Sequence, residues 1–356
     1  MEDAIIVFMD KEGKSHEFEI DDEETILDLS RKGVTSINLE TVLSIPVLKE
    51  LELGGNSLEE IDLSPLSKCK DLQKLSLFKN QLKSINLAPL RDCIALEELN
   101  LGSNQFSTID LTAIGSSQSL KRIRLFNNGM SKINIEPLSS CASLETLEIE
   151  NNEIKSIDLK PLSNCSSFQQ LNLMYNKLKT VNLTPLTSCT MLKFVYLHHN
   201  QLENIDLTPF ENCKDLRILR LGGNLIKEID LTPLSSCVEL RRLGLAMNRI
   251  TSLDLSPLAG AEHLSSLDIA GNQLTKIDLN PLSNCEELTE LYLYSDHPQE
   301  NEFAKLDISA LFNCVDLEDF GVSDETELVA DKNLKDEDDI PIAIEELLDE
   351  KRIDWI

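Results

Sequence analysis

The chain contains none of the short motifs that mark common catalytic and nucleotide-binding sites. It has no P-loop, no Gly-rich dinucleotide turn, no His-Glu-x-x-His pair and no Gly-x-Ser-x-Gly elbow. Only five histidines occur, and the adjacent pair His198 and His199 would point to opposite sides of a strand instead of chelating one ion. The sequence therefore predicts a protein that is not an enzyme and holds no metal or cofactor.

Long apolar runs are also missing. No stretch approaches the length of a membrane span, and no basic segment precedes the short apolar run at 5–9, as it would in a secretory signal. The formal net charge is −29, from 62 acidic and 33 basic residues, which disfavours nucleic acid as a partner. Much of the excess acid lies in the two end segments, 1–24 and 315–356. We expect a soluble, cytoplasmic protein that does not bind membranes.

The nine cysteines follow no pattern of disulfides or metal sites. Their number is odd, Cys-x-x-Cys never occurs, and all stand at one position of a repeat, where Ser117 and Ala261 replace them in two copies. A position that accepts Cys, Ser or Ala suits a small packed side chain, so we expect reduced, structural thiols. They are Cys69, Cys93, Cys141, Cys165, Cys189, Cys213, Cys237, Cys285 and Cys314.

What the sequence does contain is a 24-residue unit that returns without slippage. Its clearest copy is 216–239, and its general form is L-x-x-L-x-L-x-x-N-x-L-x-x-I-D-L-T-P-L-S-S-C. A repeat of this length predicts a solenoid in which each copy packs against its neighbours. The repeated asparagine is expected to turn the chain and to hydrogen-bond the backbone of adjacent copies. These asparagines are Asn56, Asn80, Asn104, Asn128, Asn152, Asn176, Asn200, Asn224, Asn248 and Asn272.

The other parts of the unit have local predictions of their own. L-x-L predicts a short parallel strand with apolar residues in the core. The Asp or Asn of I-D-L is expected to support turns and caps. Ser-Pro or Thr-Pro predicts one helical turn, with Ser or Thr as its N-cap and Pro at its first position.

This pattern resembles the leucine-rich repeat superfamily over about residues 25–322. The resemblance implies an α/β solenoid, a right-handed superhelix shaped as a horseshoe or arc. Its concave face would carry a parallel β-sheet and its convex side short helical turns, and such a solenoid usually serves as a protein-binding platform. The I-D-L-[ST]-P-L-x-x-C phrase looks more like tandem repeats of intracellular microbial proteins, including archaeal ones, than like extracellular repeats.

Both ends depart from the repeat. Residues 4–20 alternate apolar and polar around a Gly-containing turn, which predicts that 1–24 form a hairpin that caps the solenoid. About thirteen turns are expected over 25–322, with Asp296 standing where the last repeated asparagine is due and a five-residue insertion beside it.

Residues 323–356 predict an acidic tail and a capping helix. Pro341 would open the helix, with Ile342, Ile344, Leu347 and Leu348 on one side and Trp355 near the end. We expect the tail to dock as a cap. Occupation of the basic concave residues as an autoinhibitory strip, or recruitment of a partner, are the alternatives.

The variable positions beside the leucines carry the functional prediction. They face the concave surface without serving the core, yet they hold all four tyrosines and six of the ten arginines. Tyr and Arg are enriched in interface hot spots, and strand propensity explains the aromatics only in part and the arginines not at all. Phe78 belongs to this group, and the candidate partner-binding residues are Arg122, Arg124, Phe126, Met174, Tyr175, Phe194, Tyr196, His198, His199, Arg217, Arg220, Arg241, Arg242, Tyr292 and Tyr294.

The charges on this surface differ along the chain. Glu145, Glu148 and Glu150 stand one repeat after Arg122 and Arg124, so these charges are expected to satisfy one another across neighbouring strands. An aromatic patch beside a cationic one follows, which suits a partner with an acidic or aromatic surface.

We therefore predict a non-enzymatic, monomeric scaffold that binds a protein on its concave face, centred on the repeats that begin at Phe168 through Leu240. Three alternatives stay open. One is a regulatory subunit of an enzyme such as a phosphatase or small GTPase. Another is a binder of nucleic acid or another anionic ligand through the arginines. The last is a structural spacer.

Overall fold

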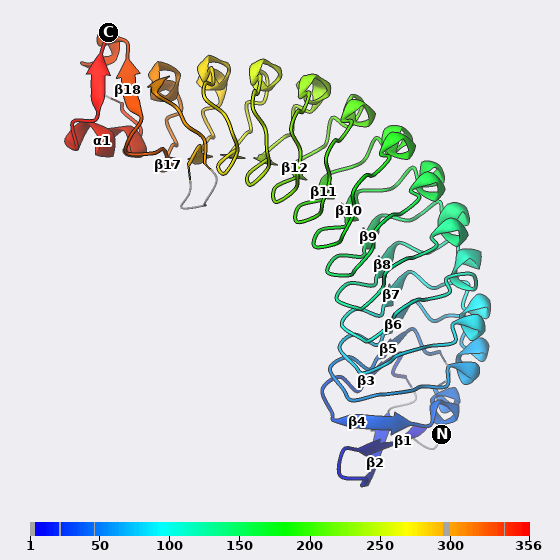
Figure 1. The fold of residues 1–356 in the computed structure, drawn as a ribbon. Helices are drawn as coiled ribbons and strands as arrows, with labels where there is room; N and C mark the ends of the chain where they lie inside the picture. The colour runs from blue at the N-terminus through cyan, green and yellow to red at the C-terminus, as the bar shows by residue number, and fades with distance from the viewer. Residues whose placement is uncertain (1–3, 21–22, 46, 295–299, 338) are drawn as a thin grey trace. The chain divides into compact units, whose positions relative to one another are not determined.

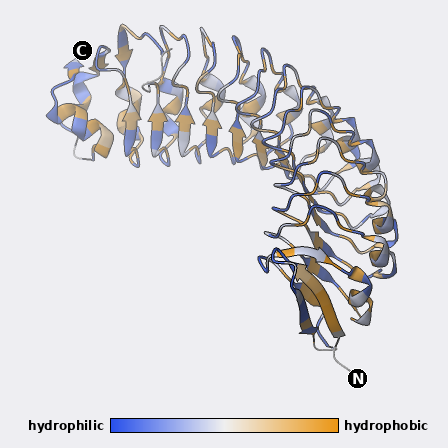
Figure 2. Cartoon of the chain, turned by 60° about the horizontal axis from the view of Figure 1, so that its bottom comes forward, coloured by the Kyte–Doolittle hydropathy of each residue, from blue (hydrophilic) through white to orange (hydrophobic). Residues whose placement is uncertain are grey.

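The computed structural model describes residues 4–20, 23–45, 47–294, 300–337 and 339–356. The chain divides into two compact units, Met1–Lys177 and Leu178–Ile356, called unit 1 and unit 2 below. Within each unit one repeat stacks on the next (Figure 1). Figure 2 shows hydrophobic residues recurring at the same places from repeat to repeat. The part of the chain that is described contains no helix of the length and apolar character needed to cross a membrane.

Unit 1 opens with an antiparallel hairpin. β1 (Ala4–Asp10) pairs with β2 (Ser15–Ile20), and β4 (Val34–Ile37) pairs with the other edge of β1. Gly13 supplies the left-handed turn residue, with a φ of 76°. Ile6, Phe8 and Ile20 are buried beneath the hairpin.

Each repeat then contributes a three-residue strand whose middle residue is apolar. The strands are parallel, and each residue pairs with its counterpart one repeat later, for example Ile218 with Arg242. The predicted parallel sheet of a solenoid is thus confirmed. In unit 1 the strands are β3 (Ile26–Asp28), β5 (Glu50–Glu52), β6 (Lys74–Ser76), β7 (Glu98–Asn100), β8 (Arg122–Arg124), β9 (Thr146–Glu148) and β10 (Gln170–Asn172). In unit 2 they are β11 (Phe194–Tyr196), β12 (Ile218–Arg220), β13 (Arg242–Gly244), β14 (Ser266–Asp268), β15 (Glu290–Tyr292) and β17 (Asp319–Gly321).

The repeated asparagines form a buried hydrogen-bonded ladder. The Asn224 Oδ1 accepts from the Leu202 amide at 3.0 Å, and its Nδ2 donates to the carbonyls of Leu197 and Leu221 at 3.0 and 2.8 Å. The amide side chain thereby satisfies three backbone groups that a tight turn would leave unpaired. The predicted role of the asparagines is confirmed.

The ladder does not stop at the insertion. Asn301 makes the same three bonds, accepting from the Leu274 amide at 2.9 Å and donating to Ile269 and Leu293 at 3.0 and 2.8 Å. The expected replacement, Asp296, lies outside the described residues. The insertion therefore enters before the ladder residue, and the asparagine itself is displaced in sequence but kept in the fold.

A short 3₁₀ turn follows each ladder segment, but its cap differs from the predicted one. The residue before the turn is a leucine in most copies, and Ser or Thr is in many copies the first residue of the turn itself. In η8 (Thr208–Phe210), the Asp206 Oδ1 accepts from the Thr208 amide at 2.9 Å. The prediction of a Ser or Thr N-cap was wrong because the turn begins at that residue: the amides of Phe210 and Glu211, from which a Thr208 cap would accept, donate to the carbonyls of Leu207 and Thr208.

The remaining turns lie opposite the strands in their own repeats. In unit 1 they are η1 (Leu39–Ser44), η2 (Ser64–Lys68), η3 (Ala88–Asp92), η4 (Ile114–Ser116), η5 (Glu136–Ser140) and η6 (Lys160–Asn164). In unit 2 they are η7 (Thr184–Ser188), η9 (Thr232–Ser236), η10 (Ser256–Leu258), η11 (Asn280–Asn284), η12 (Ser309–Asn313) and η13 (Lys332–Leu334).

All nine cysteines are free thiols, as predicted. Eight are buried and Cys69 is half-buried. Burial raises the pKa of several of them, to about 12 for Cys93 and about 11 for Cys141. A thiol with such a pKa is protonated at neutral pH and behaves as a small packing group.

The tail of unit 2 folds back as a small sheet with one helix. β16 (Lys305–Asp307), β18 (Glu327–Ala330) and β19 (Ile353–Trp355) are parallel, and α1 (Ile342–Asp349) precedes β19. The described tail is therefore docked. The predicted helix face is buried at Ile344 and Leu347, but Ile342 is 57% exposed and Ala343 is buried instead. The Ala343 amide donates to the Leu317 carbonyl at 3.1 Å, which turns the first residue of α1 outward.

Candidate functional site

In the repeat strands from β3 to β15, the first and third residues lie on one face, called the sheet face, while the middle residue is buried in the core. In unit 2 the register aligns these residues into two rows. The first row is Phe194, Ile218, Arg242, Ser266 and Glu290, and the third row is Tyr196, Arg220, Gly244, Asp268 and Tyr292.

The sheet face of unit 1 carries charges that pair with each other. The Arg124 Nε donates to Glu148 at 2.8 Å, and Arg122 pairs with Glu98 and lies 3.7 Å from Glu145. These partners belong to adjacent repeats, so the predicted mutual neutralisation is confirmed for Glu145 and Glu148, whereas Glu150 forms no ion pair among the described residues. The neutralisation occupies the candidate residues Arg122 and Arg124 with acids of the same chain.

Aromatic side chains of unit 1 also contact each other. The rings of Phe78 and Phe126 lie 5.7 Å apart. Gly102 leaves the space for the Phe126 ring, because a Cβ on Gly102 would stand 2.7 Å from that ring. Phe126 is half-buried on this face.

Several candidates prove not to lie on strands. Tyr175 and His199 occupy the turn after their strands, with φ values of 52° and 53°, because the turn toward the ladder asparagine needs one left-handed residue. Tyr175 is 49% exposed. Arg217 and Arg241 precede β12 and β13, while Met174, His198 and Tyr294 follow their strands. These candidates therefore flank the strands, whereas the candidates on strands are Arg122, Arg124, Phe194, Tyr196, Arg220, Arg242 and Tyr292.

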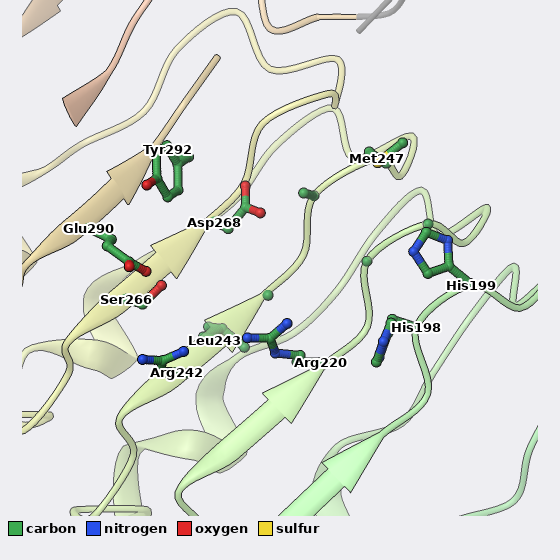
Figure 3. A pocket seen from close by; sticks show the side chains of 14 residues that line it. His198, His199, Arg220, Arg242, Leu243, Met247, Ser266, Asp268, Glu290 and Tyr292 are labelled. Carbon is green, nitrogen blue, oxygen red and sulfur yellow. The ribbon is translucent and has the colours of Figure 1, made fainter. Parts of the chain in front are cut away.

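A hollow of about 310 Å³ opens on the sheet face of unit 2 (Figure 3). It exists because Gly244 fills the third position of β13, between Arg220 and Asp268 on the adjacent strands. The small residues Gly222 and Ala246 also line the hollow, and they leave the space beside Gly244 open. Five candidates predicted from sequence line the hollow, namely His198, His199, Arg220, Arg242 and Tyr292.

Sequence reasoning missed the acidic side of the hollow. Asp268 and Glu290 line it opposite Arg220 and Arg242, with Ser266 and Met247 completing the wall (Figure 3). Within the described parts of the chain, none of these four charged side chains forms an ion pair at 4.0 Å or less. The signal that could have found them is the register of one repeat per strand, which puts the acids two strands from the arginines.

Burial changes the pKa of ionisable side chains around the hollow. Desolvation lowers the pKa of His198 to about 4, with smaller contributions from the charges of His199 and Arg220. His198 is therefore neutral at pH 7, and the ring of Tyr196 meets it edge-on at 6.2 Å. Burial also raises the pKa of Asp268, against the opposing effects of its bond from the Ala270 amide and the charge of Arg220.

No cluster of three or more metal-ligating side chains occurs among the residues with described positions. The geometry is that of a shallow charged surface beside aromatic side chains. Such an arrangement can bind a polar ligand through hydrogen bonds and charge.

Comparison with known proteins identifies the repeat. The family described as the BspA type leucine-rich repeat region matches residues 26–121 and 91–217, and a second leucine-rich repeat family matches 190–250 and 238–297. The chain belongs to the leucine-rich repeat superfamily. A search of curated proteins finds no match.

Solved leucine-rich repeat structures share this fold. An internalin (inlF) from Listeria monocytogenes is 23% identical with a TM-score of 0.64, over 86% of this chain and 91% of that one. A leucine-rich repeat protein of Leptospira interrogans is 20% identical with a TM-score of 0.65, over 94% and 96%. The ectodomain of the Arabidopsis thaliana receptor kinase GASSHO1/SCHENGEN3, in complex with Casparian strip integrity factor 2, is 24% identical with a TM-score of 0.61. That match covers 83% of this chain and 40% of the receptor chain.

Proposed function

We propose that this leucine-rich repeat protein is a non-enzymatic scaffold that binds a partner protein on the sheet face of unit 2. The observation that supports this most directly is the contrast in ion pairing between the two sheet faces. In unit 1, Arg122 and Arg124 are held by glutamates of the same chain. In unit 2, Arg220 and Arg242 stand exposed, with no ion-pair partner in the described residues.

The side chains beside these arginines suit an interface. Phe194 and Tyr196 are half-buried on β11, and Tyr196 pairs directly with Arg220 in the strand register. Tyr and Arg are the residue types that most often dominate binding energy, because they combine large contact area with hydrogen bonding. Here they are held on strands, so little ordering entropy is lost when a partner docks.

The receptor structure solved with Casparian strip integrity factor 2 offers a precedent for ligand binding by this fold. The interface proposed here excludes Arg122 and Arg124, because acids already occupy them. The proposed interface also gives a role to the acidic and basic side chains on the sheet face of unit 2, which a purely structural spacer would not need.

We further propose that the protein works in a reducing compartment such as the cytoplasm. Nine thiols without one disulfide are the state expected where glutathione and thioredoxin keep cysteines reduced. When cells are lysed directly into denaturant with an alkylating agent and no reductant, all nine cysteines should be labelled. Protection of a pair from alkylation until a reductant is added would contradict this location.

Affinity purification tests the interface. The bait is the full chain as wild type and as the triple variant Tyr196→Ala, Arg220→Ala, Arg242→Ala. Loss of a central anchor typically costs about 2 kcal/mol, about a thirtyfold loss of affinity, so a specific protein should disappear from the triple variant. An enzyme among the captured proteins would favour a regulatory role.

The matched control is Arg122→Ala, Arg124→Ala, which removes arginines from the same two repeat positions of unit 1. It should capture the same partner as the wild type. Identical capture by the wild type and the triple variant, with both chains folded by circular dichroism, would refute the proposed interface.

A further inference from the structure

We infer that the hollow of unit 2 receives a dipolar segment of the bound protein, one that carries a carboxylate and an ammonium or guanidinium group together. The inference rests on the proposed function and names the chemistry of the partner. It differs from the sequence-based prediction of an acidic or aromatic partner surface, because the structure places acids in the same hollow as the arginines.

The two rows of the sheet face carry the inference. In the third row Arg220 and Asp268 are separated by Gly244, and in the first row Arg242 and Glu290 are separated by Ser266. Both arginines thus stand on one side and both acids on the other. Since neighbouring strands lie about 4.8 Å apart, the backbones that carry opposite charges are about 9.6 Å apart.

Because of this spacing, arginine and acidic side chains form ion pairs with each other on the sheet face of unit 1 but not in the hollow of unit 2. Arg124 and Glu148 stand one repeat apart, on adjacent strands, and form an ion pair. Arg220 and Asp268, both among the described residues, stand two repeats apart with a glycine between them and form no ion pair with each other. The gap between them is the hollow, and its two ends have opposite charge.

Because the two ends of the hollow have opposite charge, a dipolar ligand segment fits it in one orientation. Its carboxylate lies against Arg220 and Arg242, whose guanidinium groups can bind a carboxylate in bidentate fashion. Its cationic group lies against Asp268 and Glu290. A ligand with carboxylates alone would meet repulsion from these two acids, and one with cations alone would meet repulsion from the arginines.

The size of the hollow agrees with this occupant. A cavity of about 310 Å³ is at the lower end of ligand pockets and holds two side-chain ends, not a folded element. Tyr292 borders the acidic end and donates a long hydrogen bond of 3.4 Å to Asp319, which keeps its ring at the rim.

Short peptides provide a probe that requires no knowledge of the partner. We would titrate full-length protein labelled with ¹⁵N-glycine, which gives thirteen signals, with the peptide acetyl-Asp-Gly-Lys-amide. Signals of Gly222, Gly223 and Gly244 should shift, while those of Gly54 and Gly102 in unit 1 should stay. The peptides acetyl-Asn-Gly-Lys-amide and acetyl-Asp-Gly-Gln-amide should each bind at least threefold more weakly, the size of one exposed charge contact. Equal affinity of all three peptides, or no shift at these glycines, would overturn the inference.

A filling variant tests the hollow in the protein's own function. Gly244→Asn places in β13 the residue that β7 and β10 have at the same position, Asn100 and Asn172. There the asparagine Oδ1 accepts from the amide two residues later, at 3.1 and 3.3 Å. A Cβ on Gly244 would meet no atom closer than 3.6 Å, so the variant should fold as the wild type does.

Gly244→Asn should abolish the peptide shifts and weaken partner capture at least fivefold, and Asp268→Asn, Glu290→Gln should weaken capture as well. If both variants capture the partner normally while the Tyr196, Arg220, Arg242 triple variant does not, the dipolar inference is wrong and the proposed interface stands. If the triple variant also captures normally, the proposed function itself fails.

Discussion

Asn301 offers a sharp test of the fold, because its place in the ladder is evident only from the structure. Its side chain is 5% exposed and makes three hydrogen bonds, to the Leu274 amide and to the carbonyls of Ile269 and Leu293. These three leucine and isoleucine residues are themselves fully buried. Asn301→Ala would therefore leave the Leu274 amide and the Leu293 carbonyl without partners and out of reach of water, while the Ile269 carbonyl keeps its bond from the Asn272 Nδ2 at 2.9 Å.

The cost follows from the number of bonds. Each net hydrogen bond contributes about 1 kcal/mol, and a buried group left unsatisfied costs about 1–3 kcal/mol. We expect the free energy of unfolding to fall by about 3 kcal/mol. Opening at Leu274 should become easier by a similar amount, so its amide should exchange with solvent about a hundredfold faster.

Urea unfolding and hydrogen exchange measured by mass spectrometry check both numbers. Asn272→Ala is the reference because Asn272 has the same set of bonds in the preceding repeat. Asn204→Ala, at an exposed site, is the control and should change the free energy of unfolding by at most about 0.5 kcal/mol. A loss below about 1 kcal/mol for Asn301→Ala beside a full loss for Asn272→Ala would refute the ladder role of Asn301.

Three further predictions concern unit 1. Gly115→Ala would put a Cβ 2.4 Å from the Pro137 carbonyl oxygen, so it should lower stability by about 1–3 kcal/mol in thermal or urea unfolding; an unchanged midpoint would contradict the close approach. Burial raises the pKa of Glu150 to about 7, so the protonated form is favoured by the fold, and stability present below the ordinary carboxyl pKa is lost as pH rises toward 7. Glu150→Gln should therefore gain stability relative to wild type between pH 4.5 and 7 and level off above that, and a difference that does not vary with pH would disprove this account. A double-mutant cycle on Arg124→Ala and Glu148→Ala should give a coupling of about 0.5–1 kcal/mol that shrinks in concentrated salt, whereas a zero coupling would mean that the pair contributes nothing.

The sequence predicted what the period dictates. Leucines at fixed spacing define the core, and the parallel strands and asparagine ladder follow because every copy must satisfy the same backbone groups. Asn301 escaped prediction because the period was broken beside it, and hydrogen bonding, not spacing, decides which residue serves the ladder. The Ser or Thr cap was mispredicted because the turn begins at that residue, and the Asp or Asn two residues earlier accepts from its amide.

The site was predicted less completely than the fold. Large residues such as Tyr196 and Arg220 are easily recognised in a sequence as candidates for binding. A hollow depends instead on small residues, and a single glycine such as Gly244 predicts no hollow by itself. The difference between Arg124 and Arg220 was also hidden. Both are arginines at the third strand position, and only the residue one repeat later, Glu148 or Gly244, determines whether the charge is neutralised.

The asparagine ladder has a consequence for how such a chain can change in length. Each ladder residue, such as Asn224, accepts from a backbone amide 22 residues earlier and donates to a carbonyl 27 residues earlier. Every junction between inner repeats is therefore made of the same atoms. If one whole repeat were removed or duplicated, the two repeats brought together would form the same ladder bonds. The distance between Arg220 and the acidic side of the hollow would change only if the removed or added repeat lay between them. A chain of this kind can gain or lose whole repeats and keep its ladder bonds, whereas its binding surface depends on which repeats are adjacent.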